Sequence, residues 1–362
     1  MQSRAAELLI MIALAAISDV ACAQAPDTTH DDPPPTLTPD RVYALDASME
    51  RVLQDFALPG LAIGIVEDGQ PVYMRGFGVR DTRTDEPVNA HTLFHVESIT
   101  RTLTATAVMQ LAERGQLGLS DSLADSPVTV TQLLTREDSA FDALGAIIET
   151  ASQQKYLQYM QTRVLNAAGM GESTFGVPIT GTNVAWPHTG TVFVRRAQRY
   201  PWDEDTMPSV GLSASIADLT RWAAVQVSHD PALLAANSYG ELIKHQRDLG
   251  RDGLAMALGW QLERRGDDWL PRQAAKGRGF SALLTLYPSQ QRAIVILSNG
   301  ETLPGKEIRN VIESVLAGEA WLPPQPSLLL RTDFQWSLGG LLAMSLLLFA
   351  VSVHYRRRRL PA

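Results

Sequence analysis

The residue types best suited to chemistry gather around Ser98, in the segment His-Val-Glu-Ser-Ile-Thr-Arg at 95–101. Ser98 follows a short apolar run and precedes a long helical pattern, which leaves two interpretations open. Its hydroxyl could cap the helix by accepting a main-chain hydrogen bond, or it could be a nucleophile in the positive field of the helix N-terminus. Arg101 lies three positions later, on the same helix face. Because a guanidinium stays protonated at neutral pH, Arg101 can supply charge and hydrogen bonds but cannot act as a general base.

Two neighbouring side chains, His95 and Glu97, are alternative proton acceptors for Ser98. The sequence alone places neither of them within hydrogen-bonding distance of the hydroxyl. The identity of a general base is therefore open at this stage.

Other reaction classes lack their motifs. The sequence has no His-Glu-x-x-His, no P-loop lysine motif and no Gly-x-Ser-x-Gly. His91 and His95 are the closest pair of histidines, but a spacing of four across a loop and a strand suits a metal poorly, so we expect no metal site. The single cysteine, Cys22, excludes a disulfide framework or a Cys-rich cluster, and we expect no cofactor. The net charge of −8 argues against a nucleic-acid partner.

Apolar spacing predicts the elements that must position these residues. We expect a helix from Ser98 to about Arg114, and a hairpin of two strands around the turn signal Asp68-Gly69. Further helices are expected at 42–56, 143–151, 156–165, 217–227 and 306–316, and strands at 61–66, 72–79, 93–96, 257–263, 280–287 and 293–299. This order predicts an α+β fold. An antiparallel sheet comes from both chain ends and is flanked by helices, a mainly helical subdomain is inserted, and a cleft lies where the parts meet.

Longer segments resemble a known family. The stretches PGLAIGIVEDGQPVYMRGFGVRD and TLFHVESITRTLTATAVMQLAERGQLGLSDSL resemble the serine β-lactamase and penicillin-binding-protein family, in particular its class C β-lactamase and esterase branch. Similar segments follow in the family's order at 128–135, 144–175, 209–226 and 279–300, so the resemblance covers 41–320. It implies the β-lactamase/transpeptidase-like fold and an acyl-enzyme formed on Ser98.

The active-site motifs of that family are only partly present. Its Ser-x-x-Lys motif corresponds to Ser98-Ile99-Thr100-Arg101, so Arg101 takes the lysine position. Its Tyr-x-Asn motif should fall within 136–143, which contains neither residue, and Phe141 is the nearest aromatic there. Its Lys/His-x-Gly motif should precede Gly279, and the resemblance makes Lys276, Gly277 and Gly279 the candidate substrate-binding residues.

These departures lead to two functional hypotheses. In the first, Ser98 attacks an ester or an amide, and catalysis is weak or lost because removing a general base typically lowers the reaction rate by about 10²–10⁴-fold. In the second, the domain is a pseudoenzyme that binds a peptide, peptidoglycan or acyl ligand without turnover. Either hypothesis requires a small-molecule or peptide acyl ligand as partner. A purely structural membrane protein is a third, weaker alternative, and the sequence sets no oligomeric state.

The N-terminal end has the pattern of a signal peptide over 1–23. Arg4 precedes the apolar run 8–17, and Ala21-Cys22-Ala23 has the small-x-small form of a cleavage site. A lipoprotein signal with Cys22 as the lipidated residue is the alternative. Residues 24–40 then predict a Pro-rich linker that leads into the hydrolase domain, 41–320.

The C-terminal end predicts a membrane anchor. A second tether is expected at 321–335, and the uncharged stretch that follows predicts a transmembrane helix over 336–355. The four arginines at 356–359 belong to a basic tail, 356–362. Because basic residues next to a membrane span are typical of the cytoplasmic side, we expect this tail to lie in the cytoplasm. We therefore expect an exported protein, held in the inner membrane with its domain on the periplasmic side.

Overall fold

The structure is a computed structural model. It describes residues 37–123, 126–176, 183–191, 194–197, 204–251 and 253–319, together with helical residues 339–341, 343–346 and 348–349. The expected signal peptide (1–23), linker residues 24–36, the tether (321–335) and the tail (356–362) lie outside these residues. The expected membrane helix, 336–355, is described only in part. Among the residues that are described, no helix combines the length and apolar character needed to cross a bilayer.

Helices cover both faces of the sheet and form most of the inserted part. The α-helices are α2 (Pro39–Phe56), α3 (Thr100–Glu113), α4 (Val130–Leu134), α5 (Ala143–Ser152), α6 (Tyr156–Tyr159), α7 (Met207–Val210), α8 (Ile216–Ser228), α9 (Ala236–Leu242) and α10 (Gly305–Ala317). Shorter helical turns are η1 (Glu97–Ile99), η2 (Ser139–Asp142), the π-helical η3 (Met160–Leu165), η4 (Glu204–Thr206) and η5 (Pro288–Gln290).

Strands from the two ends of the domain build one large sheet. Its order within the described residues is β3-β2-β1-β14-β13-β12-β11-β10-β9, with every neighbouring pair antiparallel. Its strands are β1 (Gly60–Glu67), β2 (Gln70–Asp81), β3 (Glu86–Pro87), β9 (Arg247–Asp248), β10 (Leu254–Met256), β11 (Gln261–Arg265), β12 (Asp268–Gly277), β13 (Phe280–Tyr287) and β14 (Arg292–Ser298). The pairing of β1 with β14 confirms the predicted sheet from both chain ends.

Two smaller sheets lie in the inserted part. One has the order β4-β8-β5, and the other pairs β6 with β7. Their strands are β4 (Phe94–His95), β5 (Thr174–Phe175), β6 (His188–Thr191), β7 (Val194–Ala197) and β8 (Leu212–Ala214). The α+β class is therefore confirmed, although the inserted part contains more strand than expected.

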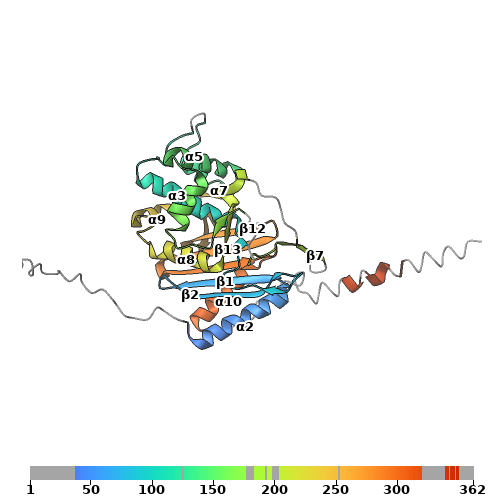
Figure 1. Ribbon diagram of the computed structural model, residues 1–362. Coiled ribbons are helices and arrows are strands. Elements are labelled where there is room, and N and C mark those ends of the chain that lie inside the picture. Colours follow the sequence, from blue (N-terminus) through green and yellow to red (C-terminus); the bar gives the residue numbers. More distant parts are fainter. Residues whose placement is uncertain are drawn as a thin grey trace, which may run out of the picture. The chain divides into compact units, whose positions relative to one another are not determined.

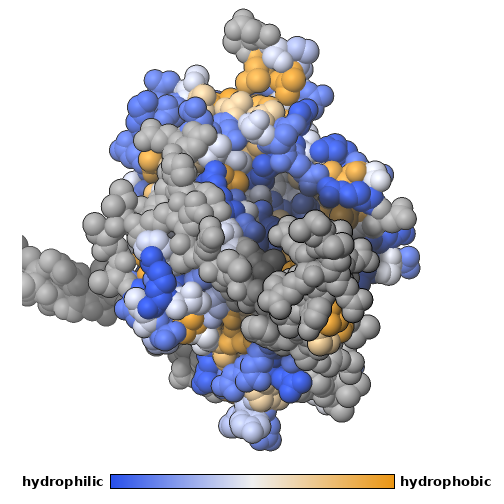
Figure 2. All heavy atoms as spheres, turned by 90° about the vertical axis from the view of Figure 1, so that its right-hand side faces the viewer, coloured by the Kyte–Doolittle hydropathy of each residue, from blue (hydrophilic) through white to orange (hydrophobic). Residues whose placement is uncertain are grey.

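The central strands are apolar on both faces because helices cover both. In β14, Ile294 and Ile296 face the core shared with α2 and α10, whereas Val295 and Leu297 face the core shared with α8. Figure 1 shows α2 and α10 on one side of the sheet and α8 on the other. Strands that are buried on both faces have continuous apolar sequences, which is why β1, β13 and β14 were predictable. The described surface in Figure 2 is mainly hydrophilic, with hydrophobic residues in small separate groups.

Two expected elements near the site are wrong in their bounds. The strand expected at 257–263 is wrong in its first half: residues 257–260 form a turn that contains Gly259 with φ +74° and follows β10, and only 261–263 belong to a strand, β11. The helix expected from Ser98 begins at Thr100, and Ser98 belongs to the preceding turn η1. Strand β12 was not expected as a separate element, although it proves central to the site.

Candidate active site

Ser98 lies in the turn η1, which joins the short strand β4 to the buried helix α3. All residues from Thr100 to Leu111 are buried, so α3 is surrounded by other elements rather than lying on the surface. The residue that caps α3 is Ile99, and no side chain makes a capping hydrogen bond there. The interpretation of Ser98 as a helix cap is therefore wrong. Its hydroxyl makes no hydrogen bond within the described part of the chain.

The backbone that presents Ser98 is strained. Glu97, directly before it, has φ +47°, a left-handed conformation that L residues avoid at a cost of about 1–2 kcal/mol. The Thr100 hydroxyl secures the turn by donating to the Glu97 carbonyl at 2.7 Å and accepting from the Leu212 amide at 3.1 Å. Strained residues held by their surroundings cluster at functional sites. This strain sets η1 apart from an ordinary helix start.

Arg101 is used as a main-chain clamp. Its guanidinium donates to the carbonyl oxygens of Arg136 at 2.5 Å and Glu137 at 3.0 Å, with a longer contact to Asp138 at 3.5 Å. It also lies over the Phe141 ring, 4.7 Å from the centroid. Burial lowers the pKa of Arg101, and nearby carboxylates oppose this effect. These contacts tie the start of α3 to segment 136–138 and give Arg101 a structural task.

The segment expected to hold a catalytic tyrosine holds none. Phe141 is fully buried and contacts Arg101 through its ring, and the Asp142 carboxylate accepts from the Ser209 amide at 2.9 Å. A tyrosine hydroxyl does reach α3 from α6, since Tyr156 pairs with Thr104 at 2.8 Å. Burial raises the pKa of Tyr156, so that hydroxyl is kept neutral and is a poor proton acceptor.

Strand β12 passes beneath η1 and brings an unexpected side chain to Ser98. Gln273, only 2% exposed, donates from Nε2 to the Ser98 carbonyl at 2.9 Å. Alternation along the strand puts Gly277 on the same face. A Cβ added at Gly277 would lie 2.9 Å from the carboxyl carbon of Glu97, so η1 approaches the strand closely there.

Lys276 is oriented differently from the other candidates. Its exposed side chain lies on the opposite face of β12, beside Arg272 and Lys306, in a hollow of about 280 Å³. Gly279 forms the turn after β12 with φ +82° and packs against Pro187. The structure thus brings Gly277 to η1 and keeps the Lys276 side chain away. Gln273 was missed, although counting every second residue back from Gly277 would have found it.

The main-chain N–H group of Lys276 lies at an edge of β12, whereas its side chain lies on a face of the strand. Gly277 and Phe280 flank a two-residue turn and form a hydrogen-bonded pair. The alternation then directs the N–H groups of Ala274 and Lys276 to the other edge of β12. Strand β11 ends there, at Gln261 opposite Arg272, so no described strand pairs with 273–277 on that side. This open edge can donate hydrogen bonds to a carbonyl oxygen that becomes negatively charged.

His95 and Glu97 form a buried pair next to Ser98. His95 Nε2 and Glu97 Oε1 are 3.2 Å apart, with 7% and 9% of the two side chains exposed. His95 Nδ1 bonds to the Leu212 carbonyl at 3.1 Å. The two alternative proton acceptors therefore lie close to each other, Glu97 in the turn η1 that carries Ser98 and His95 at the end of β4.

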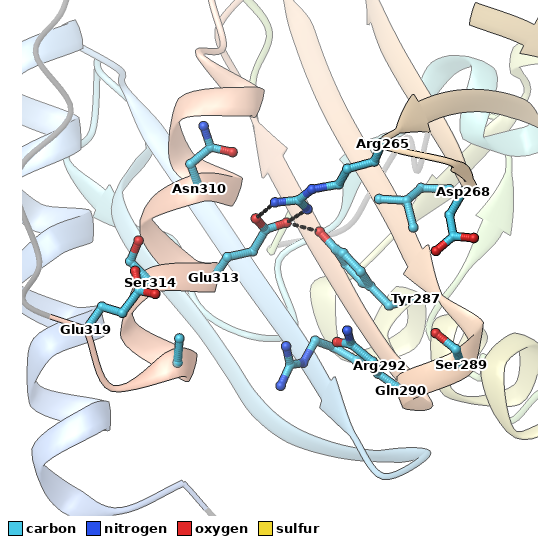
Figure 3. A pocket seen from close by; sticks show the side chains of 12 residues that line it. Arg265, Asp268, Tyr287, Ser289, Gln290, Arg292, Asn310, Glu313, Ser314 and Glu319 are labelled. Atoms are coloured by element: carbon cyan, nitrogen blue, oxygen red, sulfur yellow. Dashed lines mark hydrogen bonds and ion pairs between the residues drawn. The ribbon is translucent and has the colours of Figure 1, made fainter. Parts of the chain in front are cut away.

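A second cavity, of about 560 Å³, lies between α10 and the sheet (Figure 3). Its cations are paired. Arg265 makes two hydrogen bonds to Glu313, which also accepts from the Tyr287 hydroxyl, and Arg292 makes two to Glu67. No group of three or more potential metal-ligating side chains was found among the residues described. We therefore place the candidate site at Ser98.

Comparisons with known proteins identify the family of this chain. The sequence profile of the Beta-lactamase family matches residues 45–136 and 137–317. Protein flp of Staphylococcus aureus (strain NCTC 8325 / PS 47) is 23% identical over 333 residues, covering 73% of this chain and 64% of that protein. The chain thus spans slightly less than two thirds of this relative. A β-lactamase of Lysobacter lactamgenus is 38% identical over 99 residues, 26% of this chain and 23% of its own length.

Solved structures show the same fold. The octameric penicillin-binding protein homologue of Pyrococcus abyssi superposes with a TM-score of 0.69 at 20% identity, covering 77% of this chain and 78% of its own. The D-alanine carboxypeptidase AmpC of Burkholderia cenocepacia superposes with a TM-score of 0.67 at 22% identity, covering 77% and 99%. The profile match extends over most of the chain and through Ser98 and Arg101. The chain belongs to the Beta-lactamase family.

Proposed function

We propose that this domain is a serine hydrolase of the β-lactamase and penicillin-binding-protein type that forms an acyl-enzyme on Ser98 and turns over slowly. The observation that carries the proposal is the position of Ser98. Its hydroxyl is not used as a helix cap, its turn is held in a strained conformation, and the open edge of β12 lies beside it. Such a site suits attack on an ester or amide carbonyl.

Slow turnover follows from the residues around the nucleophile. Arg101 is occupied by three carbonyl oxygens, and Phe141 cannot accept a proton. Loss of a positioned base typically slows a reaction by about 10²–10⁴-fold. We expect acylation by activated esters to be measurable and hydrolysis of unactivated amides to be very slow.

The test is covalent labelling of the full chain. A fluorophosphonate and a fluorescent penicillin are added separately, and the intact mass is followed over time, with Ser98→Ala as the matched control. A mass increase that requires Ser98 supports the proposal. Absence of labelling in folded protein at high probe concentration argues for the alternative below.

The alternative is a non-catalytic domain that binds a peptide, peptidoglycan or acyl ligand. The clamping role of Arg101 favours it, because this residue now stabilises segment 136–138. A ligand that raises the melting temperature without being converted, equally in wild type and Ser98→Ala, would support this alternative.

We also propose that the domain is exported and held at the inner membrane through 336–355. The support is the sequence pattern of 1–23 and of the uncharged stretch followed by four arginines. Protease treatment of intact spheroplasts tests this proposal. Degradation of the domain from outside is the expected result, and full protection would contradict it.

A further inference from the structure

A hollow lined by cations lies on the face of the sheet that α10 covers, the opposite face of β12 from Gln273. Arg272 and Lys276 reach it from β12, and Lys306 reaches it from the first turn of α10. Its volume is about 280 Å³, close to the lower end of ligand pockets. Among the described residues that line it, one has a carboxylate: Glu301, which accepts from the Gly279 amide at 3.2 Å. The lining therefore has more positive than negative charge.

A single carboxylate next to the hollow is shared by three cations. Glu263, on β11, accepts from Arg272 Nη1 at 2.8 Å and from the two Nη atoms of Arg309 at 3.1 and 3.2 Å. Lys306 Nζ lies 3.3 Å from the Oε1 atom of the same carboxylate. One carboxylate carries one negative charge, so Glu263 alone does not balance these three side chains.

The other acidic side chains nearby leave this excess in place. Glu313 lies 3.7 Å from Arg309 Nε, but Arg265 already makes two hydrogen bonds to it (Figure 3). Glu307, in the first turn of α10, is exposed and does not line the hollow. Within the described residues, two positive charges therefore remain unbalanced. The cluster sets the carboxylates of Glu263, Glu301 and Glu313 against the cations of Arg265, Arg272, Lys276, Lys306 and Arg309.

Two of these cations are buried and have unused hydrogen-bond donors. Arg272 is 8% exposed and Arg309 is 5% exposed. Within the described part of the chain, the Nε atom of neither side chain makes a hydrogen bond. Burial of a charge is costly unless an opposite charge compensates it. A buried guanidinium with an unused donor, in the wall of a cavity that has excess positive charge, indicates an anionic ligand.

The start of α10 adds main-chain donors at the same hollow. Gly305 and Lys306 line it, and α10 begins after Pro304 with no hydrogen bond from a capping side chain of the described residues. The first amides of a helix have no partner inside the helix, and the helix dipole attracts anions to them. A guanidinium, two ammonium groups and helix amides therefore meet at one cavity, and these are the groups with which proteins bind phosphate.

We propose that this hollow binds a phosphate group, carried either by a soluble phosphorylated molecule or by a lipid headgroup. A phosphate monoester has a charge of about −1.5 to −2 at pH 7, which matches the excess of positive charge. A carboxylate has one negative charge and leaves part of that excess unbalanced. The site is separate from Ser98 and does not depend on the function proposed above. It also gives the Lys276 side chain, which points away from Ser98, a binding role of its own.

The test is isothermal titration calorimetry of the full chain at constant ionic strength. Inorganic phosphate, glycerol 3-phosphate and dihexanoyl phosphatidic acid are the separate probes. The double variant Lys276→Gln/Lys306→Gln removes two exposed ammonium groups, so it should fold and raise the Kd by about tenfold or more. The matched control is Lys155→Gln/Lys244→Gln, which removes the other two lysines of the sequence and the same net charge. This control should bind each probe as wild type does.

The three probes distinguish the two sources of phosphate. Binding of dihexanoyl phosphatidic acid about tenfold or more tighter than glycerol 3-phosphate indicates a lipid headgroup, and similar affinities indicate a soluble phosphate. Melting temperatures give a second measurement, since a bound probe should raise that of wild type and of the control but not that of Lys276→Gln/Lys306→Gln. The proposal is wrong if folded wild type binds no probe at about 10 mM, or if the two double variants bind within about threefold of each other.

Discussion

Replacing Arg101 by lysine recreates the family's Ser-x-x-Lys motif and tests whether that residue does chemistry or holds the fold together. In the structure the guanidinium uses a planar fork to reach two carbonyl oxygens within 3.0 Å, with a third at 3.5 Å. It also lies 4.7 Å above the Phe141 ring. An ammonium is a compact point charge that cannot reproduce this fork.

The expected magnitude follows from these contacts. A hydrogen bond to a charged group contributes about 1.5–3 kcal/mol, and a cation–π contact about 0.5–2 kcal/mol. Lysine can keep one hydrogen bond and part of the ring contact, while segment 136–138 regains some hydration. We therefore expect Arg101→Lys to lower the free energy of unfolding by about 2–4 kcal/mol.

The assay is urea unfolding of wild type and Arg101→Lys, together with single-turnover acylation of both proteins by a neutral nitrophenyl ester. Arg114→Lys, an exposed arginine that follows the same helix, is the control and should cost less than about 1 kcal/mol. Acylation should not rise, because Phe141 still lacks a hydroxyl. Unchanged stability, or acylation more than about tenfold faster, would refute the clamp assignment.

The remaining predictions concern strain, packing and acid stability. Glu97→Gly should raise the free energy of unfolding by about 1 kcal/mol relative to Glu97→Ala, because only glycine relieves the positive φ, and thermal melting of the two variants checks this. Gly277→Ala should displace the Glu97 carboxyl group and cost about 1–3 kcal/mol, and an unchanged free energy of unfolding in urea would contradict the packing. Burial alone would raise the pKa of Glu263, but Arg309, Arg272 and Lys306 lower it to about 2. The stability that Glu263 contributes is present above about pH 4.5 and is lost as pH falls toward 2, so the advantage of wild type over Glu263→Gln should shrink across that range in urea titrations.

The sheet was predictable where both of its faces are covered by helices. The continuous apolar runs 280–287 and 293–299 correspond to β13 and β14 almost residue for residue. Strand β12 was not predicted because charged residues interrupt the apolar pattern of its sequence. Arg272 is buried against Glu263 of the neighbouring strand, a cross-strand pairing that a single segment does not reveal.

The site was predictable as a location and only partly as a set of residues. Ser98 and Gly277 follow from the family's motifs, and the structure brings η1 and β12 together. The alternative of a cap at Ser98 could be decided only from the geometry of the turn. The Lys276 side chain was assigned to the site from its position in the sequence, and one residue along a strand reverses the face.

The partners of Arg101 and His95 could not be inferred from the sequence because they are main-chain atoms far away in the chain. Arg101 reaches carbonyls about 35 positions on, and His95 bonds to the carbonyl of Leu212. A carbonyl oxygen carries no sequence signature, so residue types alone gave Arg101 a chemical role and left His95 unplaced. The distances in the structure correct the role expected for Arg101 and show where the His95 side chain lies.

The measurement that tests the central claim most directly is the intact mass of the full chain after incubation with a fluorophosphonate, compared with Ser98→Ala. The account predicts a single adduct on wild type, located at Ser98 by peptide mapping, and none on the variant. No adduct on folded wild type, or an adduct on another residue, would contradict the claim that Ser98 is a nucleophile.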